Sequence, residues 1–480
     1  MPKIKKTKIV ATLGPASSTK ETLKAMLDEG VDVFRINFSH ANYDDVKKRI
    51  EMIRELNKEF GYNAAILGDL QGPKLRVGVM KEEVVVQEGD EIIFATGKRF
   101  EGTKDRVYMT YDRFPQDAKP GERVLLDDGK LIFEVISTNQ KDEVKTRVIQ
   151  GGPLKSKKGV NLPNTNISQP ALTEKDIEDA IFAISQKVDW MALSFVRHAE
   201  DLMQLEELIS KHGEHKIPII AKIEKPEAVE NIDKIVAYCD GLMVARGDLG
   251  VEIPAEEVPL IQKQLVLRAK RARIPVIIAT QMMETMISSL TPTRAEVNDV
   301  ANSVMDGADA VMLSGETSVG AYPVQVITQM SNIIRSVEDS PLIQVPQSPP
   351  HIRTKRYITK SICYHAALMA NEINAKAIST LTNSGYTAFQ ISAWRPSAHI
   401  LVFTSNHRIL TQLNLLWGVK AFYYDKFVST DETIEDVNNI ACKKGYLETS
   451  DMLISLAAMP IKDKGMVNTL RVTEITSCSF

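Results

Sequence analysis

The sequence predicts an α/β protein: an eight-stranded (β/α)8 TIM barrel with an inserted β-rich lid domain and a C-terminal α/β domain. Three observations support this prediction. Apolar runs alternate with amphipathic segments through most of residues 1–340, a stretch of short β segments interrupts that alternation once, and a proline-rich stretch separates it from a second alternation. With 480 residues, 44% of them hydrophobic, the chain is long enough to build several domains with buried cores.

The barrel prediction depends on the number of strand-like runs. Three precede the interruption, with helix-like stretches at Lys20–Glu29 and Tyr43–Lys58, and five follow it. Three plus five is eight, the number that closes a TIM barrel. An open doubly wound sheet is the alternative, but it needs no eighth strand and its Gly-rich nucleotide turn is missing. The runs are Lys8–Leu13, Val31–Asn37, Ala64–Leu70, Val188–Ser194, Ile217–Ile223, Gly241–Ala245, Val276–Ala279 and Ala310–Leu313.

The interruption, from about Val77 to Asn166, reads as an inserted β domain, and Pro341–Pro350 reads as a linker because proline sustains neither a helix nor a central strand. We therefore expect the barrel at 1–71 and 169–340, the lid at 72–168 and the C-terminal domain at 341–480. The C-terminal domain should open with a helix and two strands, at Thr359–Asn371, Ala377–Thr380 and His399–Phe403. The β segments of the insert are Val84–Val86, Glu91–Ala95, Arg123–Leu126, Leu131–Ile136 and Val144–Ile149.

Charge and cysteine usage narrow the class of protein. The formal charge is -3, and no dense Lys/Arg block follows the first eight residues, so we expect neither a nucleic-acid nor a membrane surface. No window approaches the ~18 apolar residues of a membrane span, and the basic opening runs directly into a strand rather than into a signal sequence. The cysteines have no metal-ligand spacing, so a cytoplasmic protein with reduced thiols is expected; they are Cys239, Cys363, Cys442 and Cys478.

Charged or hydroxylic residues close most of the predicted barrel strands. Reactive groups of a TIM barrel stand at the carboxyl ends of its strands, so these residues should meet on one rim. Such a concentration of cations and carboxylates predicts that this rim is the active site. The strand ends are Arg35–His40, Asp69, Ser194, Lys222–Glu224, Arg246–Asp248, Thr280–Gln281 and Ser314–Glu316.

The chemistry of this rim points to phosphate and a divalent metal. Glu224 and Asp248 end neighbouring strands and offer oxygen ligands that suit Mg²⁺ or Mn²⁺, unless they form surface salt bridges. Lys222 lies on the same side of its strand as Glu224 and is placed to neutralise a phosphoryl group. Arg35 and Arg76 either bind nucleotide phosphates or form structural ion pairs. Since no Walker-type or dinucleotide motif is present, side chains and metal must hold the phosphate.

Essentially the whole chain resembles the pyruvate kinase family. The segments that carry the resemblance occur in the family's order: 11–17 (ATLGPAS), 35–40 (RINFSH), 72–76 (GPKLR), 158–163 (KGVNLP), 221–224 (AKIE), 244–250 (VARGDLG), 279–282 (ATQM), 292–296 (PTRAE) and 314–317 (SGET). The resemblance implies transfer of phosphate from phosphoenolpyruvate to ADP with Mg²⁺. It also implies a homotetramer.

The resemblance assigns roles to individual residues. Glu224 and Asp248 would hold the divalent cation, and Lys222 would contact the phosphoryl group. The amides of Gly247 and Asp248 would bind the substrate carboxylate, and Thr280 would lie near the enol carbon. Ser314 and Glu316 would either relay the proton or form ordinary rim hydrogen bonds. Arg35 would bridge substrate and nucleotide, and the insert would close as a lid that excludes water. The nucleotide residues would be Arg76, Lys158, Asn37 and His40.

One position departs from the commonest family pattern. Many members carry Glu where this sequence has Lys74, and they bind K⁺ among the equivalents of Asn37, Ser39 and Asp69. The neighbouring Leu70, Gln71 and Val77 resemble the family branch that works without a monovalent cation. We therefore expect Lys74 to replace K⁺, so that K⁺ is not required. The alternative is a surface lysine that does not reach the pocket.

The C-terminal domain contains a hydroxyl-rich loop resembling the one where family members bind phosphorylated regulators, or it forms an ordinary turn. Its residues are Thr382, Asn383, Ser384, Gly385 and Thr387. Two other functions stay open: a Mg²⁺-dependent aldolase or lyase barrel, and a catalytically silent sugar-phosphate sensor. The first has no use for Lys222, Arg35 and a lid together, and the second has no use for an intact rim.

Overall fold

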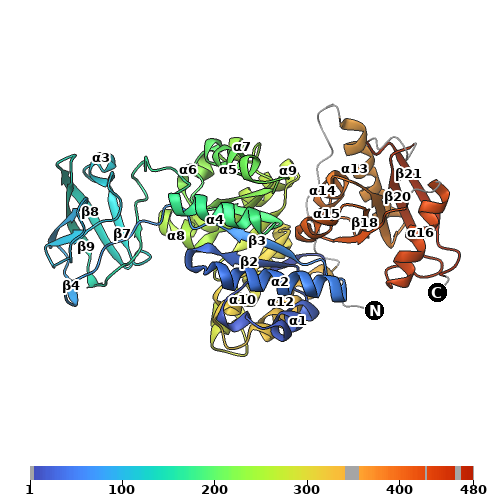
Figure 1. The fold of residues 1–480 in the computed structure, drawn as a ribbon, viewed down its shortest axis with the longest axis horizontal. Coiled ribbons are helices and arrows are strands. Elements are labelled where there is room, and N and C mark those ends of the chain that lie inside the picture. Colours follow the sequence, from blue (N-terminus) through green and yellow to red (C-terminus); the bar gives the residue numbers. More distant parts are fainter. Residues whose placement is uncertain (1–4, 341–355, 427–429, 460–465, 479–480) are drawn as a thin grey trace.

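The computed structural model describes residues 5–340, 356–426, 430–459 and 466–478. Figure 1 shows three bodies in a row, with a β-rich domain at one end, a barrel in the middle and an α/β domain at the other end. The predicted linker Pro341–Pro350 lies outside the described residues. The three-part architecture is the predicted one, whereas the predicted domain boundaries stay predictions.

The central body is a closed parallel barrel in the order β1-β16-β15-β14-β13-β12-β3-β2. Its strands are almost wholly buried on both faces, which explains why they read as continuous apolar runs. The predicted TIM barrel is thus confirmed. The strands are β1 (Lys8–Thr12), β2 (Val33–Asn37), β3 (Ala65–Asp69), β12 (Trp190–Leu193), β13 (Ile219–Ile223), β14 (Gly241–Ala245), β15 (Val276–Ala279) and β16 (Ala310–Leu313).

Helices surround the barrel, and four of them, α1, α2, α4 and α10, begin at a side chain that caps the first turn. In α10, the Thr293 hydroxyl accepts from the Glu296 amide and the Glu296 carboxylate accepts from the Thr293 amide, which satisfies two free N–H groups. The helices are α1 (Lys20–Glu29), α2 (Tyr43–Phe60), α4 (Glu174–Ser185), α5 (Ala199–His212), α6 (Pro226–Glu230), α7 (Ile232–Ile235), α8 (Arg246–Glu252), α9 (Val258–Ala272), α10 (Arg294–Asp306), α11 (Gly315–Ser318) and α12 (Pro323–Glu338).

The inserted domain leaves the barrel after β3 and has a core of its own around Phe94, Phe114 and Phe133. Its chain turns away at Gly72, whose φ of 71° favours glycine and where a Cβ would lie 2.7 Å from the Phe195 ring. Six strands pair in the order β11-β7-β8-β9-β5-β6, and β10 pairs with β4. The elements are β4 (Val84–Val86), β5 (Glu91–Ala95), β6 (Arg106–Tyr108), α3 (Phe114–Asp117), β7 (Arg123–Leu126), β8 (Leu131–Thr138), β9 (Glu143–Gln150), β10 (Gly152–Leu154) and β11 (Val160–Asn161).

The C-terminal domain is a five-stranded sheet in the order β19-β18-β17-β20-β21, with only β21 antiparallel to its neighbour. Cys442 and Cys478 form a disulfide between the end of α16 and the segment after β21, so the expectation of four reduced thiols is wrong for this pair. Cys239 and Cys363 are free and buried. The elements are α13 (Tyr357–Glu372), β17 (Ala377–Leu381), α14 (Tyr386–Ala393), β18 (His399–Thr404), α15 (His407–Gln412), β19 (Val419–Tyr423), α16 (Thr430–Lys443), β20 (Met452–Ala457) and β21 (Thr469–Glu474).

The C-terminal domain covers the N-terminal face of the barrel. Its residue Leu415 is fully buried in the same apolar cluster as the interior barrel residues Trp190 and Met243. Asp309, just before β16, pairs with Arg395 at 2.8 Å and accepts from the Trp417 amide at 3.2 Å. The opposite face, where the strands end, is therefore not covered by the C-terminal domain, and the inserted domain leaves the barrel from that face.

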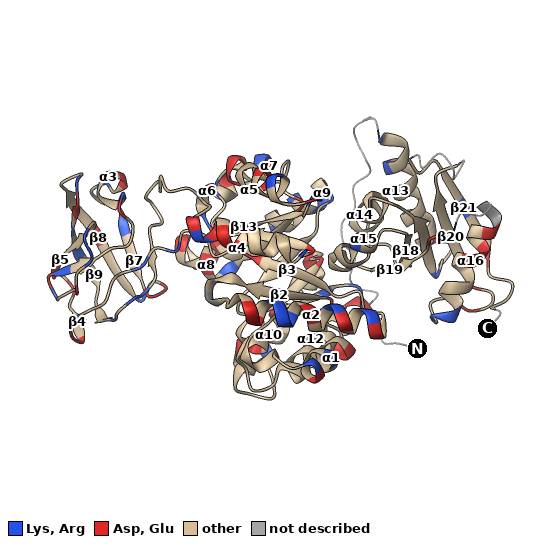
Figure 2. Cartoon of the chain, in the orientation of Figure 1, with Lys and Arg blue, Asp and Glu red and all other residues tan. Residues whose placement is uncertain are grey.

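Acidic and basic residues are interspersed over the helices of the barrel in Figure 2. None of the helices in the described ranges has the length and apolarity that a bilayer crossing requires.

Candidate active site

Four charged side chains form a continuous chain across the carboxyl-terminal rim of the barrel. Arg35 Nε lies 2.6 Å from Asp69 Oδ2. Lys222 Nζ lies 3.3 Å from Asp69 Oδ1 and 2.9 Å from Glu224 Oε1, and it donates to Ser194 Oγ at 2.6 Å. The parallel register explains this gathering, because β2, β3, β12 and β13 lie side by side and end at the same level.

Burial and neighbouring charges set the protonation of this chain. Burial alone would lower the pKa of Lys222, but Asp69 and Glu224 outweigh it and raise the pKa above its ordinary value. For Asp69, burial is outweighed in turn by Lys222 and Arg35, so its pKa is lowered. Burial raises the pKa of Glu224, and the nearby Asp248 carboxylate adds to this effect. The rim therefore holds two permanent cations in a dry environment.

The next two strands place Gly247, Asp248 and Thr280 together. The Gly247 amide opens helix α8 and donates to Thr280 Oγ1 at 2.7 Å, while Asp248 is half-buried in the same first turn. Thr280 has φ of 69° and Gln281 has φ of 55°. Two consecutive left-handed residues, one of them β-branched, are a strained arrangement that clusters at functional sites.

A partly buried ion pair that the sequence did not reveal supports Thr280. Arg246 forms a two-pronged pair with Asp299 of α10, at 2.5 and 2.7 Å. The same guanidinium donates to the Thr280 carbonyl oxygen at 2.8 Å. Sequence reasoning treated Arg246 only as part of a strand end and did not consider Asp299, since nothing in the local pattern links a helix residue to a strand end more than 50 positions earlier.

Ser314 and Glu316 follow the last strand, as predicted, and are tied to the backbone. Glu316 accepts from the Ser314 amide at 2.7 Å and from the Met283 amide at 3.1 Å. Its burial raises the pKa despite these donors. The carboxylate thus holds the ends of β15 and β16 together, and the predicted proton-relay role stays a prediction.

The predicted nucleotide residues lie partly on the insert. Arg76 donates to the Lys157 carbonyl oxygen at 3.1 Å, and Lys158 pairs with Asp127 at 2.8 Å. Asn37 is on the barrel and accepts from the Ser39 amide at 3.0 Å, which caps a short 3-10 turn. The side chain of His40 lies outside the described part of the structure.

Lys74 is exposed on the tether to the insert, and its ammonium takes part in none of the ion pairs found among the described residues. Asp69, its predicted partner, is engaged by Arg35 and Lys222 instead. The insert is joined to the barrel by a contact that the sequence did not suggest: Asn161 Nδ2 donates to Glu252 Oε1 at 2.8 Å, and Lys225 pairs with the same oxygen at 2.7 Å.

The donor set at the rim fits a hard divalent cation. Glu224 is 2% exposed and lies near enough to Asp248 for the two carboxylates to repel one another. Within the described residues no group of three or more His, Cys, Asp or Glu side chains is placed to hold a metal ion. A two-carboxylate site leaves most coordination positions to water and substrate oxygens, as Mg²⁺ sites commonly do.

The predicted regulatory loop lies on the C-terminal domain and runs from the end of β17 into the first turn of α14. The Gly385 amide donates to Thr382 Oγ1 at 3.0 Å, and Asn406 Nδ2 donates to the Asn383 carbonyl oxygen at 3.3 Å. Thr387 is buried. The loop lies on the side of the molecule away from the rim, and its role in binding a regulator stays a prediction.

A closed parallel barrel whose carboxyl-terminal rim gathers cations such as Arg35 and Lys222 beside several carboxylates defines an enzyme that acts on an anionic substrate. Residues 4–327 match the family model "Pyruvate kinase, barrel domain", and residues 360–473 match "Pyruvate kinase, alpha/beta domain". The chain therefore belongs to the pyruvate kinase family and is a phosphotransferase, as the sequence predicted.

Individual relatives agree over nearly the full length. The pyruvate kinase of Mycobacterium tuberculosis is 42% identical over 473 residues, which cover 98% of each chain. That of Corynebacterium glutamicum is 42% identical over 98% of this chain and 97% of its own. A solved pyruvate kinase from Cryptosporidium parvum superimposes with a TM-score of 0.90 at 32% identity, covering 98% of this chain and 96% of its own.

Proposed function

We propose that this protein transfers the phosphoryl group of phosphoenolpyruvate to ADP, giving pyruvate and ATP, in a reaction that needs Mg²⁺ or Mn²⁺. The observation that carries the proposal is the position of Lys222. Its ammonium is held between Asp69, Glu224 and Ser194 at the rim. A fixed, permanently charged ammonium beside a metal-binding carboxylate is suited to stabilising a phosphoryl group in transit.

Substrate binding follows from the neighbouring residues. A carboxylate bound by the amides that open α8 would lie against Thr280 Oγ1, because the Gly247 amide already donates to that atom at 2.7 Å. The Thr280 hydroxyl would then face the carbon that must be protonated once the phosphoryl group has left. Arg35, on the other side of Lys222, is placed to contact the phosphate groups of both substrates.

Glu224 and Asp248 would hold the divalent cation, which would supply charge neutralisation for the phosphate oxygens. Arg76, Lys158, Asn37 and His40 would bind the nucleotide where the insert approaches the barrel. The separate core of the insert supports its role as a lid, because it allows movement as a unit. Closure would exclude water, which competes with ADP for the phosphoryl group.

The enzyme works without K⁺ in this proposal. Lys74 is exposed on the tether that joins the insert to the barrel and is free of acidic partners among the described residues, so closure of the insert is able to carry its ammonium toward Asp69, Asn37 and Ser39. Membership of the family also supports a homotetramer in the cytoplasm, with a phosphorylated sugar bound by the loop from Thr382 to Thr387.

The proposal is tested by a lactate-dehydrogenase-coupled assay with phosphoenolpyruvate, ADP and Mg²⁺. Replacing Lys222 by Met should lower kcat far more than it changes either KM, because the ammonium acts mainly in the transition state. The matched control is Lys234→Met, a lysine in the surface helix α7. Turnover of phosphoenolpyruvate without ADP would favour the aldolase or lyase alternative, and no turnover in either assay would favour the silent sensor.

A further inference from the structure

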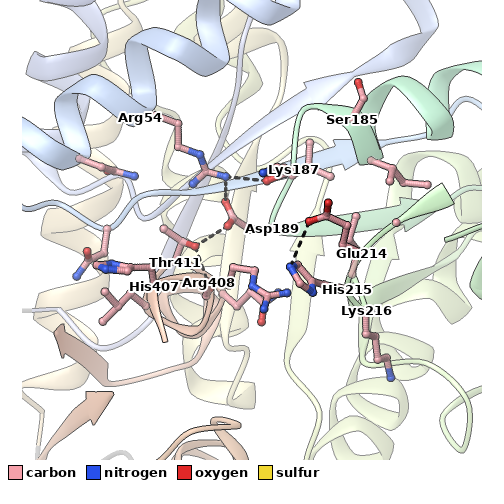
Figure 3. Close-up of a pocket in the computed structure, with 18 of the residues that line it drawn as sticks. Arg54, Ser185, Lys187, Asp189, Glu214, His215, Lys216, His407, Arg408 and Thr411 are labelled. Carbon is pink, nitrogen blue, oxygen red and sulfur yellow. Dashed lines mark hydrogen bonds and ion pairs between the residues drawn. The ribbon is translucent and has the colours of Figure 1, made fainter. Parts of the chain in front are cut away.

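A cavity of about 660 Å³ lies between the N-terminal face of the barrel and helix α15 of the C-terminal domain. Its walls come from the end of α2, the turn after α4, the segment between α5 and β13, and α15 (Figure 3). This volume is within the range of small-molecule sites. The active-site rim is at the opposite end of the barrel strands, and none of the predicted regulatory-loop residues from Thr382 to Thr387 lines the cavity.

The lining is strongly basic, with five Lys or Arg side chains against two carboxylates. Three of the cations, Lys58, Lys187 and Arg408, have no ion pair among the described residues, and all three are exposed. The other two are already partnered: Arg54 with Asp189 and Lys216 with Asp240, both at 2.9 Å.

The carboxylates do not neutralise these free cations. Asp189 is buried and is already bound by Arg54 and by the Thr411 hydroxyl (Figure 3). It also accepts from the Ile66 amide at 2.7 Å. Glu214 is exposed and lies 3.8 Å from His215. The unpaired positive charge in the lining is therefore a feature of the folded chain, and a concave surface strengthens its attraction for an anion.

The floor of the cavity is different in character, because Ile184, Val188, Ile217 and Leu410 contribute buried apolar side chains to it. A ligand that uses both parts must have an anionic end and a carbon framework. An inorganic ion would leave the apolar floor uncovered. We propose that this cavity is a binding site for an organic phosphate monoester, a phosphate attached to a sugar or nucleoside framework.

The two domains share the site. Lys58 and Lys187 come from the barrel, whereas Arg408 comes from the C-terminal domain, so a phosphate placed among them would link the two bodies. Asp189 directly precedes β12, the strand that leads to Ser194, the hydroxyl partner of Lys222. The binding site is therefore built on the same strand as part of the active site.

Isothermal titration of the full-length protein tests the proposal with three ligands: a hexose 6-phosphate, a nucleoside 5′-monophosphate and inorganic phosphate. Excess phosphoenolpyruvate and Mg²⁺ occupy the active site. The variant is Lys187→Ala/Arg408→Ala, and its control is Lys48→Ala/Lys211→Ala, which removes two exposed lysines from α2 and α5 that do not line the cavity. Thermal unfolding verifies that both variants fold.

At least one organic phosphate should bind more tightly than inorganic phosphate. The Lys187→Ala/Arg408→Ala variant should bind it at least tenfold more weakly, and the control should bind it within twofold of the wild type. Equal affinity in both variants would overturn the assignment. The assignment would also be overturned if Thr382→Ala/Ser384→Ala lost all binding while the cavity variant bound like the wild type. The ligand would then occupy the regulatory loop. Inorganic phosphate that binds as tightly as either organic ligand would also overturn it.

Discussion

Replacing Asp299 should lower kcat, although this residue lies on helix α10 outside the rim. Its carboxylate holds Arg246 in a two-pronged pair, and Arg246 in turn donates to the carbonyl oxygen of Thr280. Replacing Asp299 by Asn keeps the size of the side chain and removes its charge. One charge-assisted hydrogen bond is lost, and the guanidinium is left without its counter-ion.

The size of the effect can be worked out from the geometry. Thr280 stands at φ of 69°, and a strained backbone of this kind costs about 1–3 kcal/mol unless its surroundings hold it in place. If the weakened pair lets Thr280 relax by that amount, kcat falls about fivefold to about 150-fold, at about 1.4 kcal/mol per tenfold. The cost to stability is smaller, about 1 kcal/mol, because the Asp299 side chain is 33% exposed.

Steady-state kinetics of Asp299→Asn provide the measurement, with Asp233→Asn as the control. Asp233 pairs with Arg268 on the surface and contacts no rim residue among the described contacts. We expect Asp299→Asn to lower kcat with KM for phosphoenolpyruvate changed less than threefold, and Asp233→Asn to resemble the wild type. A wild-type kcat in Asp299→Asn would refute the view that this pair positions Thr280.

Three further results are expected. Lys74→Glu should be nearly inactive in K⁺-free buffer at matched ionic strength and be partly rescued by KCl; tenfold stimulation of the wild type by K⁺ would contradict the role of Lys74. Asn161→Ala removes the 2.8 Å hydrogen bond to Glu252 that joins the insert to the barrel, so trypsin should cut the tether after Lys74 several times faster. An unchanged cleavage rate would show that this hydrogen bond does not restrain the insert. Burial lowers the pKa of Lys8 from 10.5 to about 7. Between pH 7 and pH 10.5 the unfolded chain therefore binds more protons than the folded chain. The contribution of Lys8 to the free energy of unfolding then rises with pH, by up to about 1.4 kcal/mol per pH unit. The Tm of Lys8→Met should lack this gain from pH 7 to pH 9, and a Tm that follows the wild type would contradict it.

The barrel was predictable because its signals are local. Each strand reads as an apolar run that ends in a polar residue, and the parallel register carries those ends to one rim, so Arg35, Lys222 and Glu224 could be expected to meet. The place of Asp69 between Arg35 and Lys222 was not predicted, since strand order brings these residues to one rim but does not decide which side chains pair.

Contacts between distant elements could not be predicted in this way. Asp299 and Glu252 are helix residues whose partners come from other parts of the chain, and one sequence has no periodicity that reports such pairing. Cys442 and Cys478 pair only because α16 and the segment after β21 lie together, which spacing does not reveal. The cavity at α15 likewise exists only once two domains are in place.

The position of Leu415 inside the barrel affects how the chain folds during synthesis. This residue lies in the interior layer of the barrel beside Trp190, yet it is synthesised well after β16, the last barrel strand. On the ribosome, all eight strands are therefore synthesised before Leu415, the residue that covers the N-terminal face of the barrel, has emerged. Until then the nascent barrel exposes apolar side chains at its N-terminal face. A truncated chain that lacks the C-terminal domain keeps this apolar surface exposed and is prone to aggregate.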